Sequence, residues 1–420
     1  MSDSLPLRTL SEMVSLQKTR VRASKDSAMP YVGLEHMETE RPDLIGWSSS
    51  ESSVSTNSVF ERDDVLFGKL RPNLRKCVLA PFAGYCSTDI VVLHPQDDVD
   101  PSFAAKVLQS DAVFRRAVAT AIGTKMPRTS WSALENLRVF SPDGAEQFRV
   151  AAILDAVDDA IRTTEGVIAK LKQIEQGLLH DLLTRGVDDG GQLRPPPDES
   201  PDLFNDSPVG RIPKSWDCSS VDSAFDVQPG LTLGPHRVLR NSPFPYLRVA
   251  NVFKGYLDLS DIASLNARPF EVAHQLLRAG DLLLVEGHAN IEEIGRVALA
   301  DERVAGFTYQ NHLLRLRPHT LEPDYCELWL NGPWVRSYWR RMCSTSSGLN
   351  TINQHTLKAI PVPTPSWEER GRITATAEMC STRVSTESAV LAKYRSLKAG
   401  LMNDLLTGRV RLRGSAEPRA

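Results

Sequence analysis

Short clusters of basic and polar residues are the clearest candidates for a functional site in this sequence. In the first half these are GKLRPNLRK, with Lys69, Arg71, Arg75 and Lys76, and GTKMPRTSW, with Thr124, Lys125, Arg128 and Thr129. In the second half they are VRSYWRRM, with Arg336, Arg340 and Arg341, and STSSGLNTINQ, with Ser347, Asn350, Asn353 and Gln354. Lys and Arg side chains neutralise phosphates or pair with guanine edges, whereas Asn and Gln suit adenine edges. These residue types are therefore suited to the recognition of nucleic acid.

Taken singly, each cluster is more typical of a solvated surface than of a binding site. The clusters recur, however, at equivalent places in the two halves, each time just before a long helical stretch. This recurrence favours a binding role. The spacing of the residues does not indicate which of them touch bases.

The sequence offers no comparable support for an enzyme. It contains neither a GxxxxGK[ST] phosphate loop nor an HExxH metal helix, and its nine histidines have no ligand spacing. PDYCELW, at 323–329, has acidic residues but lacks the later acidic-x-Lys of a metal-dependent nuclease. NSPF at Asn241 and NGPW at Asn331 lack the first proline of the Asn-Pro-Pro-aromatic turn that grips an extruded base in amino-methyltransferases. We therefore predict no catalytic residue, no metal site and no cofactor bound by this chain.

Length and composition narrow the class of protein. The chain has 420 residues, of which 41% are hydrophobic, enough for two or more buried cores. The formal charge of −3 means that binding of nucleic acid must come from local patches. The six cysteines form no CxxC pair, which is typical of reduced thiols in a cytoplasm. With no stretch of about 20 apolar residues, the expectation is a soluble, cytoplasmic protein.

A tandem duplication organises the chain. GLLHDLLTRGV, which begins at Gly177, matches GLMNDLLTGRV, which begins at Gly400, at seven of eleven positions and an offset of 223 residues. The same offset relates CSTDIVVLHP to YQNHLLRLRP. Earlier counterparts, YVGLEHM at Tyr31 and YLRVANV at Tyr246, lie at a shorter offset. Repeats of this kind define the architecture and must be found before the fold is assigned.

Each repeat ends in a predicted helix of nearly 40 residues. Apolar residues follow the 3, 4, 3, 4 spacing of a coiled-coil seam at 150, 154, 157, 161, 168, 171, 178 and 182, and again at 373, 377, 380, 384, 391, 394, 401 and 405. Thr164 and Glu175 interrupt the first seam, and Glu387 and Lys398 interrupt the second at the same places. An ordinary amphipathic helix packed on its own domain remains an alternative. A stripe this narrow favours a partner helix, and the simplest partner is the other copy.

The predicted fold class is α+β, with two similar mixed α/β domains separated by two long helices that pair as an antiparallel coiled coil. The expected segments are a first globular domain (1–145), a central helix (146–187), a Pro/Gly-rich linker (188–209), a second globular domain (210–366), a C-terminal helix (367–410) and a tail (411–420).

Taken together, these features resemble the specificity (S) subunits of type I restriction–modification systems over essentially the full chain. The helix endings LKQIEQGLLHDLLTRGV and YRSLKAGLMNDLLTGRV carry the resemblance most specifically, with GTKMPRTSWSALENLRV and SGLNTINQHTLKAIPVPTP beside them. The resemblance implies that each globular part is a target recognition domain, which reads one half of a split DNA site. The long, proline-rich segment 188–216 is less typical of this family.

The resemblance also implies the partners. These are double-stranded DNA, two methyltransferase (M) subunits that methylate an adenine in each half-site, and restriction (R) subunits in the full complex. S-adenosylmethionine and ATP would be bound by those other subunits. The M subunits would dock on the outer faces of the helices, near Lys170, Lys172, His180, Asp181, Lys393, Arg395, Asn403 and Asp404.

Two other functions stay open at this point. One is a specificity subunit whose single partner combines cleavage and methylation. The other is a coiled-coil scaffold whose globular domains bind protein, which would show neither salt-dependent DNA affinity nor a sequence preference.

Overall fold

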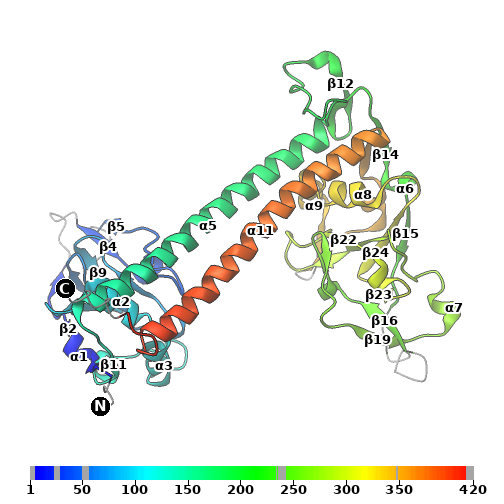
Figure 1. Ribbon diagram of the computed structural model, residues 1–420. Helices are drawn as coiled ribbons and strands as arrows, with labels where there is room; N and C mark the ends of the chain where they lie inside the picture. Colours follow the sequence, from blue (N-terminus) through cyan, green and yellow to red (C-terminus); the bar gives the residue numbers. More distant parts are fainter. Residues whose placement is uncertain are drawn as a thin grey trace, which may run out of the picture. The chain divides into compact units, whose positions relative to one another are not determined.

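The computed structural model describes residues 5–22, 29–49, 56–232, 234, 243–346 and 349–412. They belong to two compact units, Met1–Gly166 with Ser388–Ala420, and Val167–Glu387. Two long helices, α5 (Gly144–Thr184) and α11 (Trp367–Leu405), contribute to both units (Figure 1). Each unit therefore contains a globular part and one end of each long helix.

The first unit is built from short strands and short helices that precede α5. Its strands are β1 (Leu7–Thr9), β2 (Val14–Leu16), β3 (Arg20–Arg22), β4 (Pro30–Val32), β5 (Ser48–Ser49), β6 (Thr56–Phe60), β7 (Val65–Gly68), β8 (Cys77–Leu79), β9 (Gly84–Cys86), β10 (Ile90–Pro95) and β11 (Arg138–Phe140). Its short helices are α1 (Leu10–Met13), α2 (Pro101–Leu108), α3 (Asp111–Ala119) and α4 (Trp131–Leu134).

A four-stranded antiparallel sheet, in the order β2-β10-β7-β8, forms the centre of this unit. Successive side chains of a strand point to opposite faces, and β7 is buried on both. Val65 and Phe67 face α2, α3 and the start of α5, whereas Leu66 packs toward Val32 and Phe60 of a five-stranded sheet. The second sheet has the order β3-β6-β9-β4-β5. The unbroken apolar run of β7 is thus explained by its position between two layers.

The second unit has its own set of elements. Its strands are β12 (Phe204–Ser207), β13 (Gly210–Pro213), β14 (Asp217–Ser220), β15 (Phe225–Pro229), β16 (Pro243–Leu247), β17 (Val252–Phe253), β18 (Tyr256–Leu257), β19 (Ala263–Asn266), β20 (Leu282–Val285), β21 (Gly287–His288), β22 (Val297–Leu299), β23 (Thr308–Tyr309), β24 (Leu313–Pro318), β25 (Ser344–Ser346), β26 (Leu349–Thr351) and β27 (Pro361–Thr364). Its short helices are α6 (Val221–Ala224), α7 (Pro269–Val272), α8 (Pro323–Leu330), α9 (Pro333–Met342) and α10 (Gln354–Lys358).

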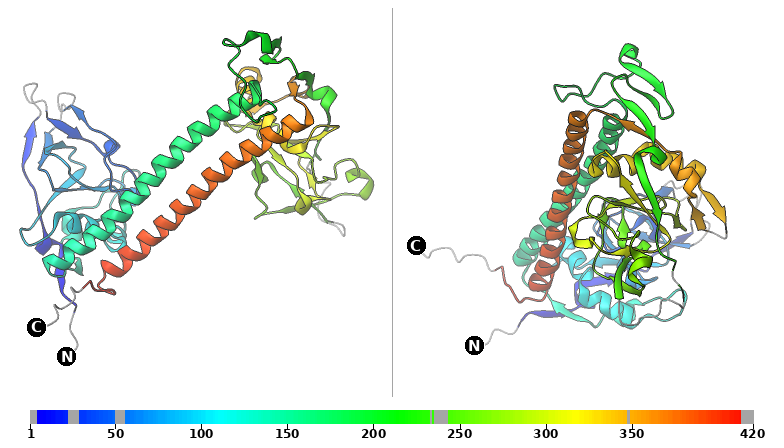
Figure 2. Two further views of the ribbon diagram at one scale, coloured as in Figure 1. Left: turned by 45° about the horizontal axis from the view of Figure 1, so that its top comes forward. Right: turned by 90° about the vertical axis from the view of Figure 1, so that its right-hand side faces the viewer.

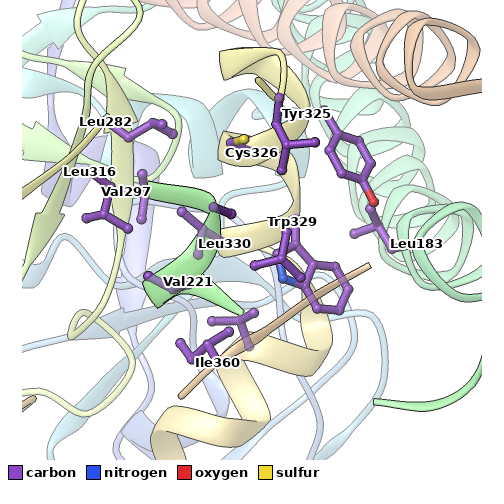
Figure 3. Packing of buried hydrophobic residues seen from close by; sticks show 14 of the residues in the cluster. Leu183, Val221, Leu282, Val297, Leu316, Tyr325, Cys326, Trp329, Leu330 and Ile360 are labelled. Carbon is purple, nitrogen blue, oxygen red and sulfur yellow. The ribbon is translucent and has the colours of Figure 1, made fainter. Parts of the chain in front are cut away.

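The core of the second unit lies between its central sheet and the end of α5. Figure 3 shows Tyr325 and Trp329 of α8 between the sheet residues and Leu183 of α5. Both aromatic side chains are fully buried, and each donates a hydrogen bond to a backbone carbonyl of β27: Tyr325 to that of Pro363 at 2.9 Å and Trp329 to that of Pro361 at 3.0 Å. The polar atoms of the two rings are therefore satisfied within the core.

The two units repeat one topology. The central sheet of the second unit has the order β15-β24-β20-β22, which matches β2-β10-β7-β8 strand for strand. Tyr31 of β4 lies in a parallel pair with β9, and Tyr246 of β16 lies in a parallel pair with β23. Helices α2, α3 and α4 of the first unit correspond in chain order to α8, α9 and α10 of the second. The predicted fold class, two similar mixed α/β domains with two long helices, is confirmed.

Within each unit the two long helices run side by side in opposite directions (Figure 2). The predicted seam positions are covered on both helices: Val150, Leu154, Ile161 and Ile168 are buried on α5, and the seam positions of α11 are buried or half-buried. Thr164 interrupts the seam without leaving an unpaired polar group, because its hydroxyl donates to the carbonyl of Ala160 at 2.8 Å. The seam is thus a coiled-coil seam with a few accommodated polar residues.

The polar seam residue Lys398 has a specific partner in the first unit. Its Nζ lies 2.5 Å from Asp158 of α5, and Asp158 also lies 2.6 Å from Lys106 of α2. Burial of Asp158 opposes ionisation, but the two ammonium groups keep its pKa below the usual value. This network joins the globular part of the unit to both long helices.

A glutamate near the start of each long helix holds the chain just past the end of the other. In the first unit, buried Glu146 of α5 accepts from the Arg411 guanidinium at 2.8 Å and from the Leu412 N–H at 2.7 Å. In the second unit, buried Glu369 of α11 pairs with Arg194 and accepts from the Val187 N–H at 3.0 Å. We call these two arrangements the glutamate clamps.

The second clamp needs a glycine where α5 ends. Gly186 has a positive φ of 63°, which favours glycine, and a Cβ there would lie 2.2 Å from the Glu369 carboxylate. The repeated ending quoted from the sequence therefore marks both a helix stop and the contact that closes the helix pair.

The segment expected as an irregular linker contains a β-hairpin. Strand β12 pairs with β13 from Phe204↔Pro213 to Ser207↔Gly210. The hairpin buries Phe204 and Ile212, and Ile212 packs in the same cluster as Leu182 and Leu183 of α5. The predicted linker over 188–209 therefore includes strand β12 near its end, whose buried Phe204 stands among prolines and aspartates, while β13 falls in the predicted second domain.

In the part of the chain that the structure describes, no helix is both long and apolar enough to span a membrane.

The glutamate clamp of the second unit gives the first testable prediction. Glu369→Ala leaves the Arg194 guanidinium and the Val187 N–H without their acceptor, so we expect the free energy of unfolding to fall by about 3 kcal/mol. Urea unfolding followed by circular dichroism measures this change. Glu368→Ala removes the exposed neighbouring carboxylate and should change stability by less than about 0.5 kcal/mol. Equal stability of the two variants would show that the clamp contributes nothing.

Candidate nucleic-acid interface

The two basic clusters of the first half lie next to each other in the first unit. The segment that follows β7 meets the hairpin Ile122–Arg128 through a β-bridge that joins Leu70 to Arg128, while a second bridge, between Ile122 and Arg128, closes the hairpin itself. The Arg71 N–H donates to the Pro127 carbonyl at 2.7 Å, which fixes one loop on the other. Clusters about 50 residues apart in the sequence therefore form one surface.

Four cationic side chains gather on this surface. Arg128 pairs with Asp89 through two hydrogen bonds of 2.9 and 3.2 Å, so the pKa of Asp89 is lowered, with Lys69 adding to the effect. Among the residues that the structure describes, Lys69, Arg71 and Lys125 form no ion pair. Arg71 and Lys125 are exposed, and Lys69 is half-buried. Among the described residues, one carboxylate, Asp89, is thus paired with one of the four cations, which leaves a local positive charge on a chain of net charge −3.

The other residues of these clusters have different surroundings. Arg75 pairs with Asp111 at 2.6 Å and lies 4.9 Å from the centre of the Phe114 ring, and Lys76 donates to the Leu34 carbonyl at 2.7 Å. Both side chains are half-buried, and each already has a polar partner within the protein.

The two threonines of the clusters also differ from each other. Thr129 is buried and its N–H donates to the Lys69 carbonyl at 3.0 Å, whereas Thr124 is exposed on the hairpin. The candidate interface of the first unit is therefore narrower than the sequence predicts, and is reduced to Lys69, Arg71, Thr124, Lys125 and Arg128.

The second unit places a hairpin at the equivalent position. Strand β26 pairs with β25 and with β21, which follows the central strand β20 as Leu70 and Arg71 follow β7. Asn350 of β26 is buried, and its amide donates to the carbonyls of His288 and Ala289 at 3.2 and 3.0 Å. Here an amide fixes the loop that a backbone N–H fixes in the first unit.

Arg336 does not belong to a binding surface, and its assignment is corrected. It is buried on the inner face of α9, and its guanidinium donates to the carbonyls of Ile291, Glu292 and Ile294, with the Glu292 bond at 2.8 Å. Burial lowers the pKa of Arg336, although nearby Glu292 opposes this shift. Its role is to hold the loop before β22.

The remaining predicted residues of the second half are dispersed. Arg340 pairs with Glu292 at 2.9 and 2.7 Å, and Arg341 is exposed. Asn353 caps α10 by accepting from the Thr356 N–H at 2.7 Å, while Gln354 is exposed beside it. Ser347 lies outside the described residues.

The loop of β21 was not predicted to belong to a nucleic-acid interface. His288 occupies the place that Arg71 has in the first unit, and His312 lies 3.8 Å from Glu286 close by. Burial raises the pKa of Glu286 above its usual value. The spacing between equivalent central strands, β7 and β20, is 217 residues rather than 223. A fixed offset of 223 therefore does not align His288 with Arg71.

The residues expected to dock partners lie on the long helices with unequal exposure. Lys170, Lys172, His180, Lys393, Arg395 and Asn403 are exposed, and Asp181 and Asp404 are half-buried. Arg395 pairs with Glu165 of α5 at 2.7 Å, and Asp404 lies 3.4 Å from Arg409. Arg395 and Asn403 also line a crevice of about 770 Å³ in the first unit, between α5, α11 and the globular part.

The buried position of Arg336 can be tested against its exposed neighbour. Arg336→Leu leaves three backbone carbonyls without their donor, and we expect a loss of about 2 to 3 kcal/mol in the free energy of unfolding. Arg341→Leu, on the solvent side of the same helix, should stay within about 0.5 kcal/mol of the unmodified chain. Chemical denaturation of both variants makes the comparison, and a stable Arg336→Leu protein would contradict the structural role.

Comparisons with known proteins were made against family models, curated sequences and solved structures. No family model matches the chain. The chain is 22% identical over 301 residues to the type I restriction enzyme MjaVIII specificity subunit of Methanocaldococcus jannaschii, covering 69% of this chain and 66% of that protein. The putative MjaX specificity subunit of the same organism is 24% identical over 209 residues, or 49% of this chain and 48% of that protein.

A third relative comes from a bacterium. The type I restriction enzyme StySPI specificity subunit of Salmonella potsdam is 20% identical over 342 residues, which cover 80% of this chain and 70% of that protein. The matches to the two M. jannaschii relatives span less than two thirds of the length of those proteins.

Two solved structures share the fold over nearly the whole chain. One, from a study of complex assembly and conformational transition in a type I R-M system, has a TM-score of 0.63 at 18% identity and covers 97% of this chain and 100% of its own. The other, a type I restriction–modification S subunit from M. genitalium, has a TM-score of 0.55 at 13% identity and covers 97% of both chains. The resemblance found in the sequence is thereby confirmed: this chain is a relative of the specificity subunits of type I restriction enzymes.

Proposed function

We propose that the chain is the DNA sequence-specificity subunit of a type I restriction–modification complex, in which each globular part reads one half of a bipartite, asymmetric site. The observation that carries this proposal is a repeated scaffold with different side chains at equivalent loops. In the first unit the loop after β7 and its hairpin present Arg71 and Lys125, whereas the second presents His288 at the corresponding place. Two domains with the same scaffold but different side chains in these loops would recognise two different half-sites.

The charge distribution supports a duplex as the ligand. Lys69, Arg71 and Lys125 form no ion pair among the described residues, so their charges are available to phosphates. Exposed Arg341, Asn353 and Gln354 offer donors and acceptors in the second unit. The positive charge is local and modest, which fits a subunit whose partners share the phosphate contacts.

The partners follow from the same proposal. Two methyltransferase subunits would dock on the outer faces of α5 and α11, near the exposed Lys170, Lys172 and Lys393. They would methylate N6 of an adenine in each half-site and would bind S-adenosylmethionine. Restriction subunits with ATP would complete the complex. This chain would itself be non-catalytic and bind no cofactor, and would contribute only recognition and spacing.

Removal of two cations should weaken the binding of DNA in a salt-dependent way. We expect Arg71→Ala with Lys125→Ala to make the slope of log affinity against log salt less negative by about 2, roughly 0.9 for each lost phosphate contact. Fluorescence anisotropy of the S–M complex with a duplex, measured from low to physiological salt, gives the slope. Arg62→Ala with Arg303→Ala removes two exposed charges elsewhere and should leave it unchanged. An unchanged slope in the first variant would exclude these residues as phosphate contacts.

The proposed function as a whole can be tested through methylation. The chain would be co-expressed with its methyltransferase in a host free of adenine methylation, and N6-methyladenine would be mapped by single-molecule sequencing. We expect a split, asymmetric motif with two short defined parts around a fixed gap. A continuous or palindromic motif would contradict reading by two different domains. A soluble, bound methyltransferase that leaves no methylation would point to a scaffold instead.

A further inference from the structure

The hairpin Ile122–Arg128 carries an apolar tip that charge recognition does not explain. Ile122 is 83% exposed, the largest exposed fraction among the large hydrophobic side chains in the part of the chain that the structure describes, and Met126 on the same hairpin is 46% exposed. Isolated exposed hydrophobic residues are common on protein surfaces. Here, however, two exposed hydrophobic side chains share one short hairpin. This hairpin belongs to the basic surface that both first-half clusters form. We therefore infer that its ligand has an apolar component.

The backbone presents this tip in a fixed conformation. The N–H of Ile122 donates to the Arg128 carbonyl at 2.9 Å, and the N–H of Arg128 donates to the Ile122 carbonyl at 3.0 Å. Gly123 has a φ of 112°, and a Cβ there would lie 3.3 Å from the Met126 carbonyl oxygen, so the turn needs glycine at this position. The Arg71 N–H holds the hairpin from outside through the Pro127 carbonyl. The Ile122 and Met126 side chains thus project from a turn whose backbone conformation is fixed.

The surroundings of the tip decide which ligand it suits. Arg71, Lys125 and Arg128 lie on the same hairpin or on the loop bridged to it, and Asp89 is the one carboxylate paired among them. An apolar patch on a protein partner would not account for the cationic side chains around the tip. A DNA duplex does, because phosphates flank a stack of apolar base faces. Apolar side chains such as Ile and Met enter such stacks as wedges between adjacent bases.

We propose that Ile122 and Met126 form a wedge that enters the base stack of the half-site read by the first unit, while Arg71 and Lys125 hold the flanking phosphates. This inference rests on the proposed function, since it assumes that this unit binds duplex DNA. The wedge opens one base step. Part of the sequence preference then comes from how easily that step deforms, and pyrimidine–purine steps deform most easily.

The test uses the full chain in complex with its methyltransferase and a duplex that contains the mapped methylation motif. 2-Aminopurine is placed at each purine of the half-site that belongs to residues 1–145, one position per duplex, because its fluorescence rises on unstacking. The methylated adenine is excluded, since the methyltransferase is expected to extrude that base on its own. We expect a rise at one step for the unmodified complex and its loss in Ile122→Ala with Met126→Ala. Methylation of the motif should fall roughly 10-fold, the size of one lost base-pair contact.

Val118→Ala with Ile45→Ala is the matched control, because it removes two exposed apolar side chains of the same unit outside the hairpin, and it should keep the rise. No rise at any step of the unmodified complex, or an equal rise in the wedge variant, would overturn the wedge while leaving specific binding intact. Loss of methyltransferase from the purified wedge variant would assign the tip to a protein interface and also overturn it. If the unmodified complex does not prefer the motif over a scrambled duplex, the proposed function itself fails, and the wedge fails with it.

Discussion

The glutamate clamps are the interactions on which the rest of the arrangement depends. Each long helix contributes one end to each unit, so each unit must fix the start of one helix beside the end of the other. Glu146 and Glu369 do this by accepting a backbone N–H and an arginine from the chain that leaves the partner helix. Because the carboxylates are buried, each contact succeeds only when the helix ends are in register. The clamps therefore tie the seam of the helix pair to the globular part of each unit.

In each unit, the sheets that form the core are distinct from the loops that are proposed to bind DNA. The central sheets of the two units have the same strand order, and both are buried on two faces. In the proposed function, recognition falls to the loop after the central strand and to the hairpin that bridges to it. These segments are fixed by backbone hydrogen bonds in the first unit, and by the β21–β26 pairing together with the Asn350 side chain in the second. The residue types in these loops can therefore differ, as at Arg71 and His288, without disturbing the core.

The sequence predicted the parts of the fold whose signal is periodic or repeated. The seam positions of the long helices, the duplication and the fold class all follow from spacing that survives in both halves. Individual side chains were harder to place. Arg336 reads as a basic residue in a basic helix, and only the tertiary structure shows that it faces three carbonyls. The hairpin β12–β13 was missed because Phe204 and Ile212 stand alone among turn-forming residues. His288 was not predicted as a site residue, because a single histidine without ligand spacing carries no signal of its own.

The central claim is that each unit reads its own half of a divided site, and a domain exchange tests it most directly. Residues 1–145 would be replaced by the corresponding domain of a relative with a different motif, with both long helices kept intact. The methylated motif of the hybrid would then be mapped in the same methylation-free host. The account predicts that one half of the motif changes, while the other half and the gap between them stay the same. A change in both halves, or in neither, would contradict it.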